Sequence, residues 1–214
     1  MDKNDAIKII TRSVKLYKNN LMGKRFLFVY NLSGSIMSYE AYFFKRNFHH
    51  LTGTKLNNCS VNNFFNKAIS NTLKHTDFEF ADDGTTPMKL QVLEQLMNIH
   101  KCAKMIGKYQ GPYVRLYTNT VTGTISGCLG FAKENENKNV PNTALNMDIR
   151  TATQNQYGNV ITIFYCLLND KNNINNKYTN VSMCKKGIDV FSYQYPDDIK
   201  EKILWSSLSL DFKK

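Results

Sequence analysis

The stretch NVITIFYCLLN, residues 159–169, is the most hydrophobic segment of the chain and indicates its fold class. Its β-branched and aromatic residues are typical of a buried strand. Segments of similar character lie on either side of it, namely PYVRLYTN (112–119), TGTISGCLGFA (122–132) and VSMCKKG (181–187). Polar loops separate these segments, so we expect successive antiparallel strands in the second half of the chain.

The first half of the chain has a mostly helical pattern. Apolar positions recur at intervals of three and four along residues 88–106, where Leu93, Leu96 and His100 share one face. Ser60 is a suitable N-cap for a helix that follows it. We predict helices at 5–21, 36–47, 61–73 and 88–106, and one strand, RFLFVYNL, at 25–32.

Helices that precede strands along the chain favour an α+β fold over alternating βαβ units. We therefore expect an α+β fold with an antiparallel β-sheet. The length of 214 residues, without an internal repeat or a Pro/Ser-rich linker, indicates a single domain at 1–214. Its parts are a helix-rich region at 1–107, a strand-rich region at 111–190 and a closing helix at about 197–208.

The composition of the chain limits the cellular compartment and the kinds of binding partner that we expect for the protein. The chain has no apolar run near the ~20 residues of a spanning helix, and its first residues lack a signal-peptide pattern. We expect a cytoplasmic protein without a membrane partner. The five cysteines are scattered and form no pattern of zinc-ligand spacing, which predicts free thiols.

The formal net charge of +11 favours a polyanionic partner such as RNA, because neutralised phosphates release counterions. Lysine outnumbers arginine 23 to 5, however, and asparagine occurs 26 times, which is also the pattern of an AT-rich genome. Arginine is the usual phosphate reader. The charge therefore favours nucleic-acid contact without deciding it.

A cluster of polar residues lies in YEAYFFKRNFHHLTG, residues 39–53, at the predicted end of a helix. His49 and His50 are half of the histidines in the chain. They are either part of an active site or polar residues that close a helix, and functional residues concentrate at such junctions. Two adjacent side chains point different ways, so we expect His50 to face inward beside Leu51 and His49 to be exposed. We expect His75 at the surface and His100 in the core.

A second cluster lies in NVPNTALNMDIR, residues 139–150, and in the residues that follow it. We expect Pro141 to begin a turn before a short helix that carries Arg150. Thr153 and Tyr157 then lead into the buried strand. A histidine can exchange a proton with a ribose 2′-hydroxyl, and an arginine can stabilise a phosphorane. The candidate catalytic set is His50, Arg150, Thr153 and Tyr157, and the candidate RNA contacts are Lys45, Arg46, Lys108 and Thr52.

Motifs for other chemistries are absent from the sequence. There is no HExxH, HxH or DxD pattern for a metal, no GxxxxGKS phosphate loop and no GxSxG nucleophile elbow. We therefore expect neither a metal nor a nucleotide cofactor.

Two segments carry a resemblance to a known family. Asn47, Phe48 and His50 to Gly53 resemble a motif of the form Asn-Phe-x-His-Leu-Thr/Leu-Gly, and Pro141 to Leu145 resemble a Pro-Asn-Ser/Thr-x-Leu segment. Both motifs are similar to those of the phage-associated branch of the Barnase–EndoU–colicin–RelE nuclease superfamily, over residues 10 to 170 or so. The resemblance implies a helical N-terminal half packed on a small antiparallel β-sheet of about four strands. It also implies a phage or prophage ribonuclease that cleaves RNA without a metal, by attack of the 2′-hydroxyl, and leaves a 2′,3′-cyclic phosphate. It assigns a role to His50 alone, and structured RNA such as tRNA is a candidate substrate.

An alternative is a non-catalytic phage protein that binds and inhibits a host or defence protein. The scarcity of arginine and the lack of a second acid–base partner for His50 favour it. The surroundings of His50 separate the two hypotheses. A nuclease is favoured if His50 lines a basic groove with Arg150 or Tyr157 within reach of one phosphate, and a binding protein is favoured if His50 is buried with both ring nitrogens bonded and no cleft nearby. A DNA-binding regulator is disfavoured, because the helix predicted at 88–106 is only weakly basic on its polar face.

Overall fold

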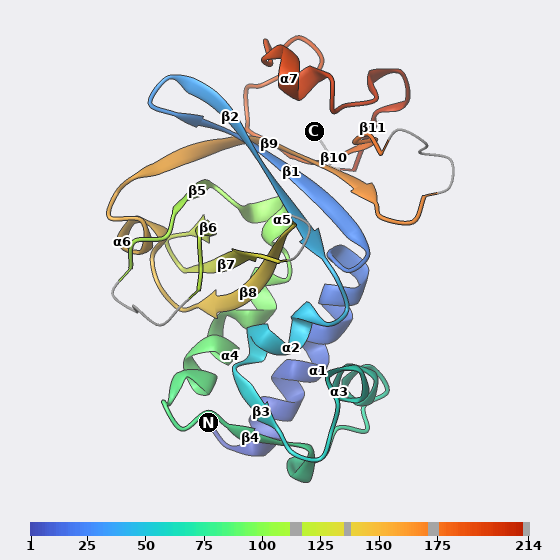
Figure 1. The fold of residues 1–214 in the computed structure, drawn as a ribbon, viewed down its shortest axis with the longest axis vertical. Coiled ribbons are helices and arrows are strands. Elements are labelled where there is room, and N and C mark those ends of the chain that lie inside the picture. The colour runs from blue at the N-terminus through green and yellow to red at the C-terminus, as the bar shows by residue number, and fades with distance from the viewer. Residues whose placement is uncertain (112–116, 135–137, 171–175, 212–214) are drawn as a thin grey trace.

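The computed structural model describes residues 1–111, 117–134, 138–170 and 176–211 (Figure 1). Its centre is formed by three long strands, β1 (Lys24–Leu32), β2 (Ser35–Phe43) and β9 (Tyr157–Leu167). β1 pairs antiparallel with β2 along one edge and with β9 along the other. β9 is the hydrophobic segment of residues 159–169, and most of its residues are buried because other strands flank it on both edges.

The sheet continues from β9 in two directions. The start of β9 pairs with β5 (Met105–Lys108), and its later part pairs with β10 (Asn180–Cys184). From β5 the order runs through three more antiparallel strands, β6 (Thr120–Thr124), β7 (Gly127–Lys133) and β8 (Asn139–Leu145). β11 (Ser209–Leu210) adds parallel to β10. In the described part of the chain, these strands form one nine-stranded sheet.

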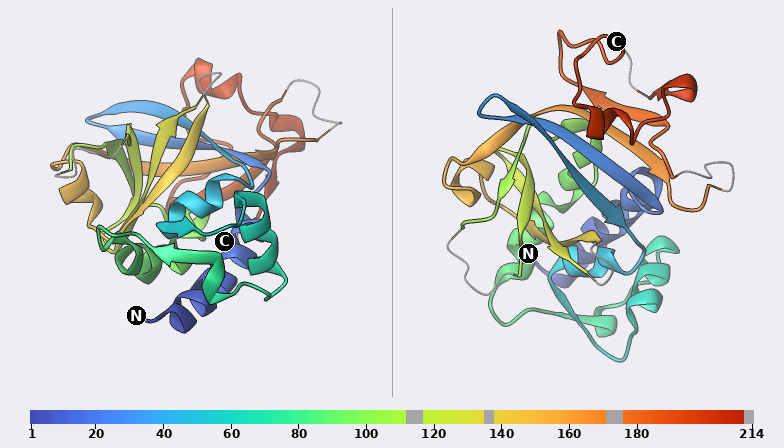
Figure 2. Two further views of the ribbon diagram at one scale, coloured as in Figure 1. Left: turned by 60° about the horizontal axis from the view of Figure 1, so that its bottom comes forward. Right: turned by 45° about the horizontal axis from the view of Figure 1, so that its top comes forward.

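The sheet curls until its two distant edges meet, as Figures 1 and 2 show. The ring of Phe131 in β7 lies 6.4 Å from that of Phe28 in β1 and 6.1 Å from that of Phe43 in β2. Asn139 at the start of β8 donates its side-chain amide to the carbonyl of Glu40 in β2 at 2.9 Å. The result is a half-barrel with an aromatic interior.

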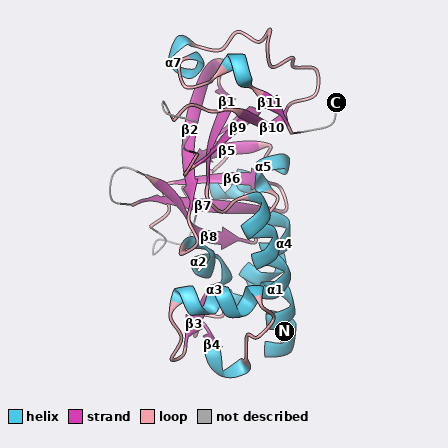
Figure 3. Ribbon diagram, turned by 90° about the vertical axis from the view of Figure 1, so that its right-hand side faces the viewer, coloured by secondary structure: helices cyan, strands magenta, loops and turns pink. Residues whose placement is uncertain are grey.

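Helices cover one end of this half-barrel (Figure 3). They are α1 (Lys3–Asn20), α2 (Asn47–Thr52), α3 (Val61–Ile69) and α4 (Thr85–Leu96), whereas α5 (Ile99–Cys102) packs on β6 and β10. α1 packs against α3 and α4, and a small hairpin of β3 (Thr54–Leu56) and β4 (Phe78–Phe80) lies beside them, with a 3-10 helix at His75–Asp77. Their apolar side chains share one core with the sheet. Asp2 caps α1, and Ser60 caps α3 as the sequence predicted.

Two smaller apolar clusters cover other faces of the sheet. α6 (Ile149–Ala152) packs on β6 and β7. The C-terminal segment, with α7 (Asp197–Lys200) and a 3-10 helix at Trp205–Ser207, packs on the opposite face of β1, β9 and β10. In Figure 1 this segment lies at the top of the molecule.

The predicted fold class is wrong. The chain is not a helical half on a four-stranded sheet, because β1 and β2 place two long strands in the N-terminal half. Residues 36–47 were predicted as a helix, but residues 35–43 form β2. The reason is the turn at Ser33 and Gly34, whose φ angles of +50° and +92° suit a two-residue hairpin. Such a turn leads the chain back alongside β1, so the residues that follow it form a second strand and not a helix.

The long helix predicted at 88–106 is also wrong in its extent. α4 ends at Leu96, α5 begins only at Ile99, and residues 105–108 belong to β5. Apolar side chains continue across these breaks because all three elements face the same core. The three- and four-residue spacing of apolar positions therefore continues past the end of the helix.

Other predicted elements have mixed outcomes. Helices at 5–21 and 61–73 and strands at 25–32, 159–169 and 181–187 are confirmed within a few residues. The segment at 122–132 is a hairpin of β6 and β7, and the turn expected at Pro141 is part of β8. The closing helix is limited to Asp197–Lys200. Of the strand predicted at 112–119, residues 112–116 lie outside the described residues, and 117–119 precede β6.

No helix in the described ranges is long and apolar enough to cross a membrane. All five cysteines are free thiols, and two of them, Cys128 and Cys166, are buried.

Candidate functional site

A cleft of about 910 Å³ opens at the mouth of the half-barrel, between the β1–β2 hairpin and the segment that joins α6 to β9. Its walls come from strands that are far apart in the sequence. The polar lining residues are Tyr30, Ser33, Ser35, Tyr39, Lys108, Gln110, Asn119, Thr120, Lys133, Asn139, Asn155, Gln156 and Tyr157. Leu32, Met37, Ile106 and Gly107 complete the lining.

The cleft is basic, aromatic and rich in amides. Lys108 and Lys133 are exposed and form no ion pair with a described residue. No carboxylate occurs among the described residues that line the cleft. Three tyrosines supply ring faces, and five Asn or Gln side chains supply paired donors and acceptors. This combination suits a ligand with negative charge and planar rings.

Two of the tyrosines belong to the β1–β2 hairpin. A Cβ on Gly158 would lie 2.4 Å from Cδ2 of Tyr30, so only glycine lets this ring lie across β9. The ring of Tyr39 packs on Phe131 at 5.7 Å. Burial raises the pKa of both phenols. Like an exposed phenol, both are therefore protonated at neutral pH and unsuited to act as bases, and the hydroxyl of Tyr39 is itself buried.

A second, shallower pocket of about 570 Å³ adjoins the cleft at Asn155. Asp148 caps α6, and its carboxylate accepts from the backbone N–H of Arg150 at 2.8 Å and from its Nη2 at 2.5 Å. These hydrogen bonds lower the pKa of Asp148 and raise the pKa of Arg150. The charge interaction between Arg150 and Tyr157 also raises the pKa of Arg150. The structure thus brings Arg150 and Tyr157 into neighbouring pockets, with Arg150 already paired.

Two predicted site residues are buried and bonded within the fold. The Thr153 hydroxyl donates to the carbonyl of Ile149 at 2.8 Å, which closes α6. The Thr52 hydroxyl donates to the carbonyl of His49 at 2.7 Å and shares a hydrogen bond with Thr54 at 2.8 Å. Both hydroxyls stabilise helix ends, so neither residue is retained in the candidate site.

The two adjacent histidines have environments opposite to those expected. In α2 the side chains of Phe48, Leu51 and Thr52 are buried, which is the i, i+3, i+4 face of the helix. His50 lies on the far side and is exposed, whereas His49 is half-buried with its ring edge against Phe64 at 5.3 Å. The expectation that His50 faces inward is wrong.

Burial, with smaller contributions from His50 and Lys89, lowers the pKa of His49 to about 4. No described residue bonds its buried Nε2. His50 lines neither of the two pockets and is exposed, so the structure meets neither of the conditions that separate the nuclease from the binding protein.

The two family-like segments meet in space, because α2 packs against β8. β8 contains a β-bulge in which Gly130 pairs with Thr143 and Phe131 pairs with Pro141, so Asn142 is the extra residue. A bulge re-aims a side chain. The amide of Asn142 donates to the carbonyl of Tyr117 at 3.3 Å and accepts from the Thr118 hydroxyl at 3.2 Å.

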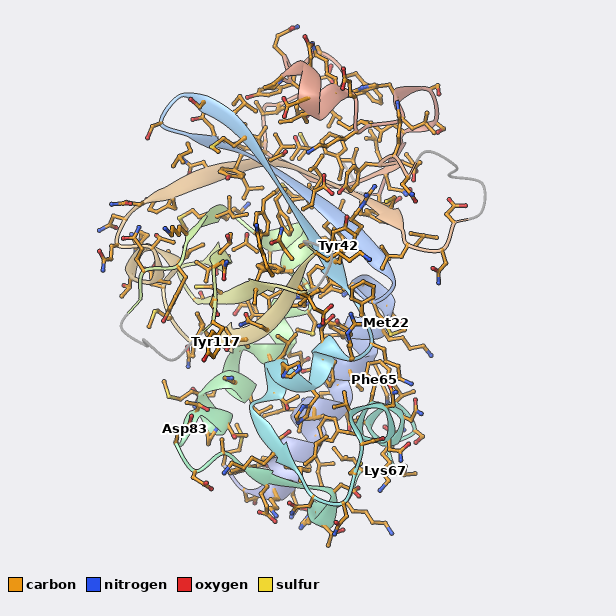
Figure 4. All side chains as sticks on the ribbon, in the orientation of Figure 1. Met22, Tyr42, Phe65, Lys67, Asp83 and Tyr117 are labelled. Carbon is orange, nitrogen blue, oxygen red and sulfur yellow. The ribbon has the colours of Figure 1, made fainter. Side chains whose placement is uncertain are left out.

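Tyr117, labelled in Figure 4, is 90% exposed beside this bulge. The candidate set omitted Asn142, although the Pro-Asn-Thr segment was its signal. Tyr30, Tyr39 and Asn139 were also omitted, because nothing in a one-dimensional pattern shows that β2 and β8 meet.

Of the predicted RNA contacts, only Lys108 lines the cleft. Lys45 donates to Asn66 at 2.8 Å and lies over the ring of Phe65. Arg46 forms an ion pair with Glu134. His75 is exposed and bonded to Asn4, and His100 is buried, both as expected.

Comparison with known proteins identifies the class of this protein. Residues 9–188 match the family described as phage-Barnase-EndoU-ColicinE5/D-RelE like nuclease 4. The match spans most of the chain, so the protein belongs to this family of phage-associated nucleases, as the two motifs indicated. No curated protein and no solved structure matches it. Within the described residues, no three His, Cys, Asp or Glu side chains are grouped so that they could hold a metal ion.

Proposed function

We propose that this protein is an RNA endonuclease that uses the ribose 2′-hydroxyl as nucleophile and needs no metal. The family supplies the nuclease class. The observation that carries the choice of RNA is the cleft. It combines three tyrosines, five side-chain amides and two lysines that form no ion pair with a described residue, and no carboxylate occurs among its described lining residues. Lysines hold phosphates, and aromatic rings stack on unpaired bases, which is the usual way in which single-stranded RNA is bound.

The RNA path in this proposal runs from the cleft along β8 to α2. Asn139 lines the cleft, and Asn142 lies three residues further along β8, which is about 10 Å at strand spacing. α2 packs on the same strand and presents His50 to solvent. One short segment of RNA can therefore contact both the cleft and His50.

The reaction that we assign is a transesterification. A base removes the proton from the 2′-hydroxyl, and that oxygen attacks the adjacent phosphorus. The bond from phosphorus to the 5′-oxygen breaks, and an acid protonates the leaving oxygen. The products are a 2′,3′-cyclic phosphate and a 5′-hydroxyl end. We assign one of the two proton transfers to His50, which carries the family motif, and the binding of phosphates elsewhere along the RNA to Lys108 and to the neighbouring Arg150.

The test is cleavage of labelled single-stranded RNA and of tRNA by purified protein in EDTA, with the chemistry of the product ends determined. We expect cleavage, and we expect His50→Gln to lower the rate by roughly 10²–10⁴-fold, the usual contribution of a general acid or base. His75→Gln is the matched control, because this exposed histidine lies outside both pockets.

Two results would change the proposal. If His50→Gln cleaves at the full rate while Tyr157→Phe does not, the proton transfer belongs to the cleft. If the folded wild-type protein cleaves neither RNA, with or without added divalent metal, the ribonuclease proposal is wrong. Capture of a host protein by that inactive chain would favour the inhibitor alternative instead.

A further inference from the structure

One wall of the cleft carries two glutamines that are paired with each other. Nε2 of Gln110 donates to Oε1 of Gln156 at 2.9 Å, and both residues line the cleft. Each amide has one donor group and one acceptor oxygen. The pair therefore leaves one oxygen, on Gln110, and one NH₂ group, on Gln156, that no described side chain bonds.

Hydrogen bonds from the backbone hold this pair in place. Gln110 donates its N–H to the carbonyl of Ala152 at 2.8 Å, and its own carbonyl accepts from Nε2 of Gln154 at 3.0 Å. The N–H of Gln156 donates to the carbonyl of Thr153 at 2.9 Å. The two residues before Gln156 have positive φ angles, +49° at Gln154 and +61° at Asn155. Such a backbone is uncommon for these residue types and is kept by its surroundings.

Gly107 completes this support from β5, where it pairs with Tyr157. A Cβ at Gly107 would lie 2.5 Å from the carbonyl oxygen of Gln156 and 2.9 Å from Cγ2 of Thr153. No larger residue fits without moving the glutamine segment. The position of Gln156 is thus fixed by packing as well as by hydrogen bonds.

We propose that the Gln110–Gln156 pair, with Tyr157 beside it, is a nucleobase-binding subsite that selects the amino-bearing bases adenine and cytosine over uracil in the RNA substrate. The inference rests on the proposed function, because it requires RNA in the cleft. The free acceptor and the free donor of the pair match the amino group and the unprotonated ring nitrogen of adenine or cytosine, whereas uracil has a carbonyl and a protonated ring nitrogen at these positions. Tyr157 supplies a ring for stacking, and Lys108 and Lys133 are available to the flanking phosphates.

The sharpest test is Gln156→Glu. The carboxylate can still accept from Gln110, but it replaces the free NH₂ donor by a second acceptor. The ring nitrogen of adenine or cytosine then loses its hydrogen-bond donor, while the protonated ring nitrogen of uracil gains an acceptor. We expect the preference for adenine and cytosine over uracil at the cleavage site to fall by roughly tenfold or more. Gln95→Glu is the control, since it adds the same charge at an exposed position of α4 outside the cleft.

Two readouts separate this inference from the proposed function. One is the sequence of the cleavage sites in a randomised RNA. The other is binding of 2′-O-methyl oligonucleotides, UUAUU and UUUUU, which cannot undergo transesterification. If the wild type binds UUAUU more tightly but cleaves nothing, the subsite stands and the ribonuclease proposal fails. If Gln156→Glu and Gln95→Glu, both folded by circular dichroism, keep the wild-type base preference, the subsite is wrong. A wild type that binds neither oligonucleotide also overturns it.

Discussion

At the scale of single residues, helix geometry decides which of two identical neighbours is available. His49 and His50 are adjacent in the chain, but α2 buries the face of Phe48 and Leu51, so the exposed histidine is His50. His49 lies at the boundary of that face, where burial holds it neutral at physiological pH. The same physical effect governs His100, which is 5% exposed.

Because two histidines are buried in the neutral form, we expect the folded protein to lose stability in mild acid. Burial, and then Lys101 and Lys24, lower the pKa of His100 to about 3. Since the unfolded histidine has a pKa near 6.5, stability is fully present above that pH and is lost as the pH falls toward 3. His100 and His49 should each cost about 2 kcal/mol between pH 7 and pH 5. Urea unfolding at both pH values measures this loss.

His100→Gln should reduce this loss by about half, whatever it does to stability at pH 7. An unfolding free energy that is equal at the two pH values in the wild type contradicts the prediction.

At the scale of elements, the residue that caps the short helix α6 affects both the stability of the helix and the charge that is free beside the cleft. Asp148 both caps this helix and holds Arg150. Asp148→Asn should keep the cap, because Asn is as good an N-cap as Asp, and should release Arg150. We expect tighter RNA binding at low salt with little change in melting temperature.

Asp148→Ala is the matched comparison, since it removes the cap as well. It should bind RNA as tightly as Asp148→Asn but lose about 1 kcal/mol of stability. Fluorescence anisotropy with a labelled oligonucleotide and thermal unfolding measure the two effects. Weaker binding by both variants would contradict the assigned role of Arg150.

The elements also show what the sequence could and could not predict. α1, α3, β1 and β9 have strong periodicity or composition and were predicted. β2 was missed because its aromatic residues fit either structure and the decision lay in the two-residue turn at Ser33. In the site, Lys108 and Tyr157 were predicted and line the cleft. Thr52 and Thr153 were not separable from exposed threonines, because their burial depends on long-range packing.

At the scale of the whole molecule, the C-terminal segment lies partly outside the family match but is part of the core. The match ends at residue 188. Beyond it, Val190, Tyr195, Ile199 and Ile203 are buried against β1 and β9. Residues outside the match are therefore required to cover the strands inside it.

Truncation after residue 188 should expose Leu27, Val29 and Phe164 and make the protein aggregate. Size-exclusion chromatography and solubility after expression measure this. A soluble, monomeric truncated protein with an unchanged melting temperature would show that the C-terminal segment is dispensable. Removal of residues 212–214 alone is the control.

The pairing of β1 with β9 also has a consequence for synthesis. Phe28 pairs with Ile163, which follows it by 135 positions. A ribosome adds those residues at about 5–20 per second, so the partner arrives on the order of 10 s later. The cleft has Tyr30 on one wall and Tyr157 on the other. It therefore does not exist on the nascent chain, and the newly made protein cannot bind a ligand there until most of the polypeptide has left the ribosome.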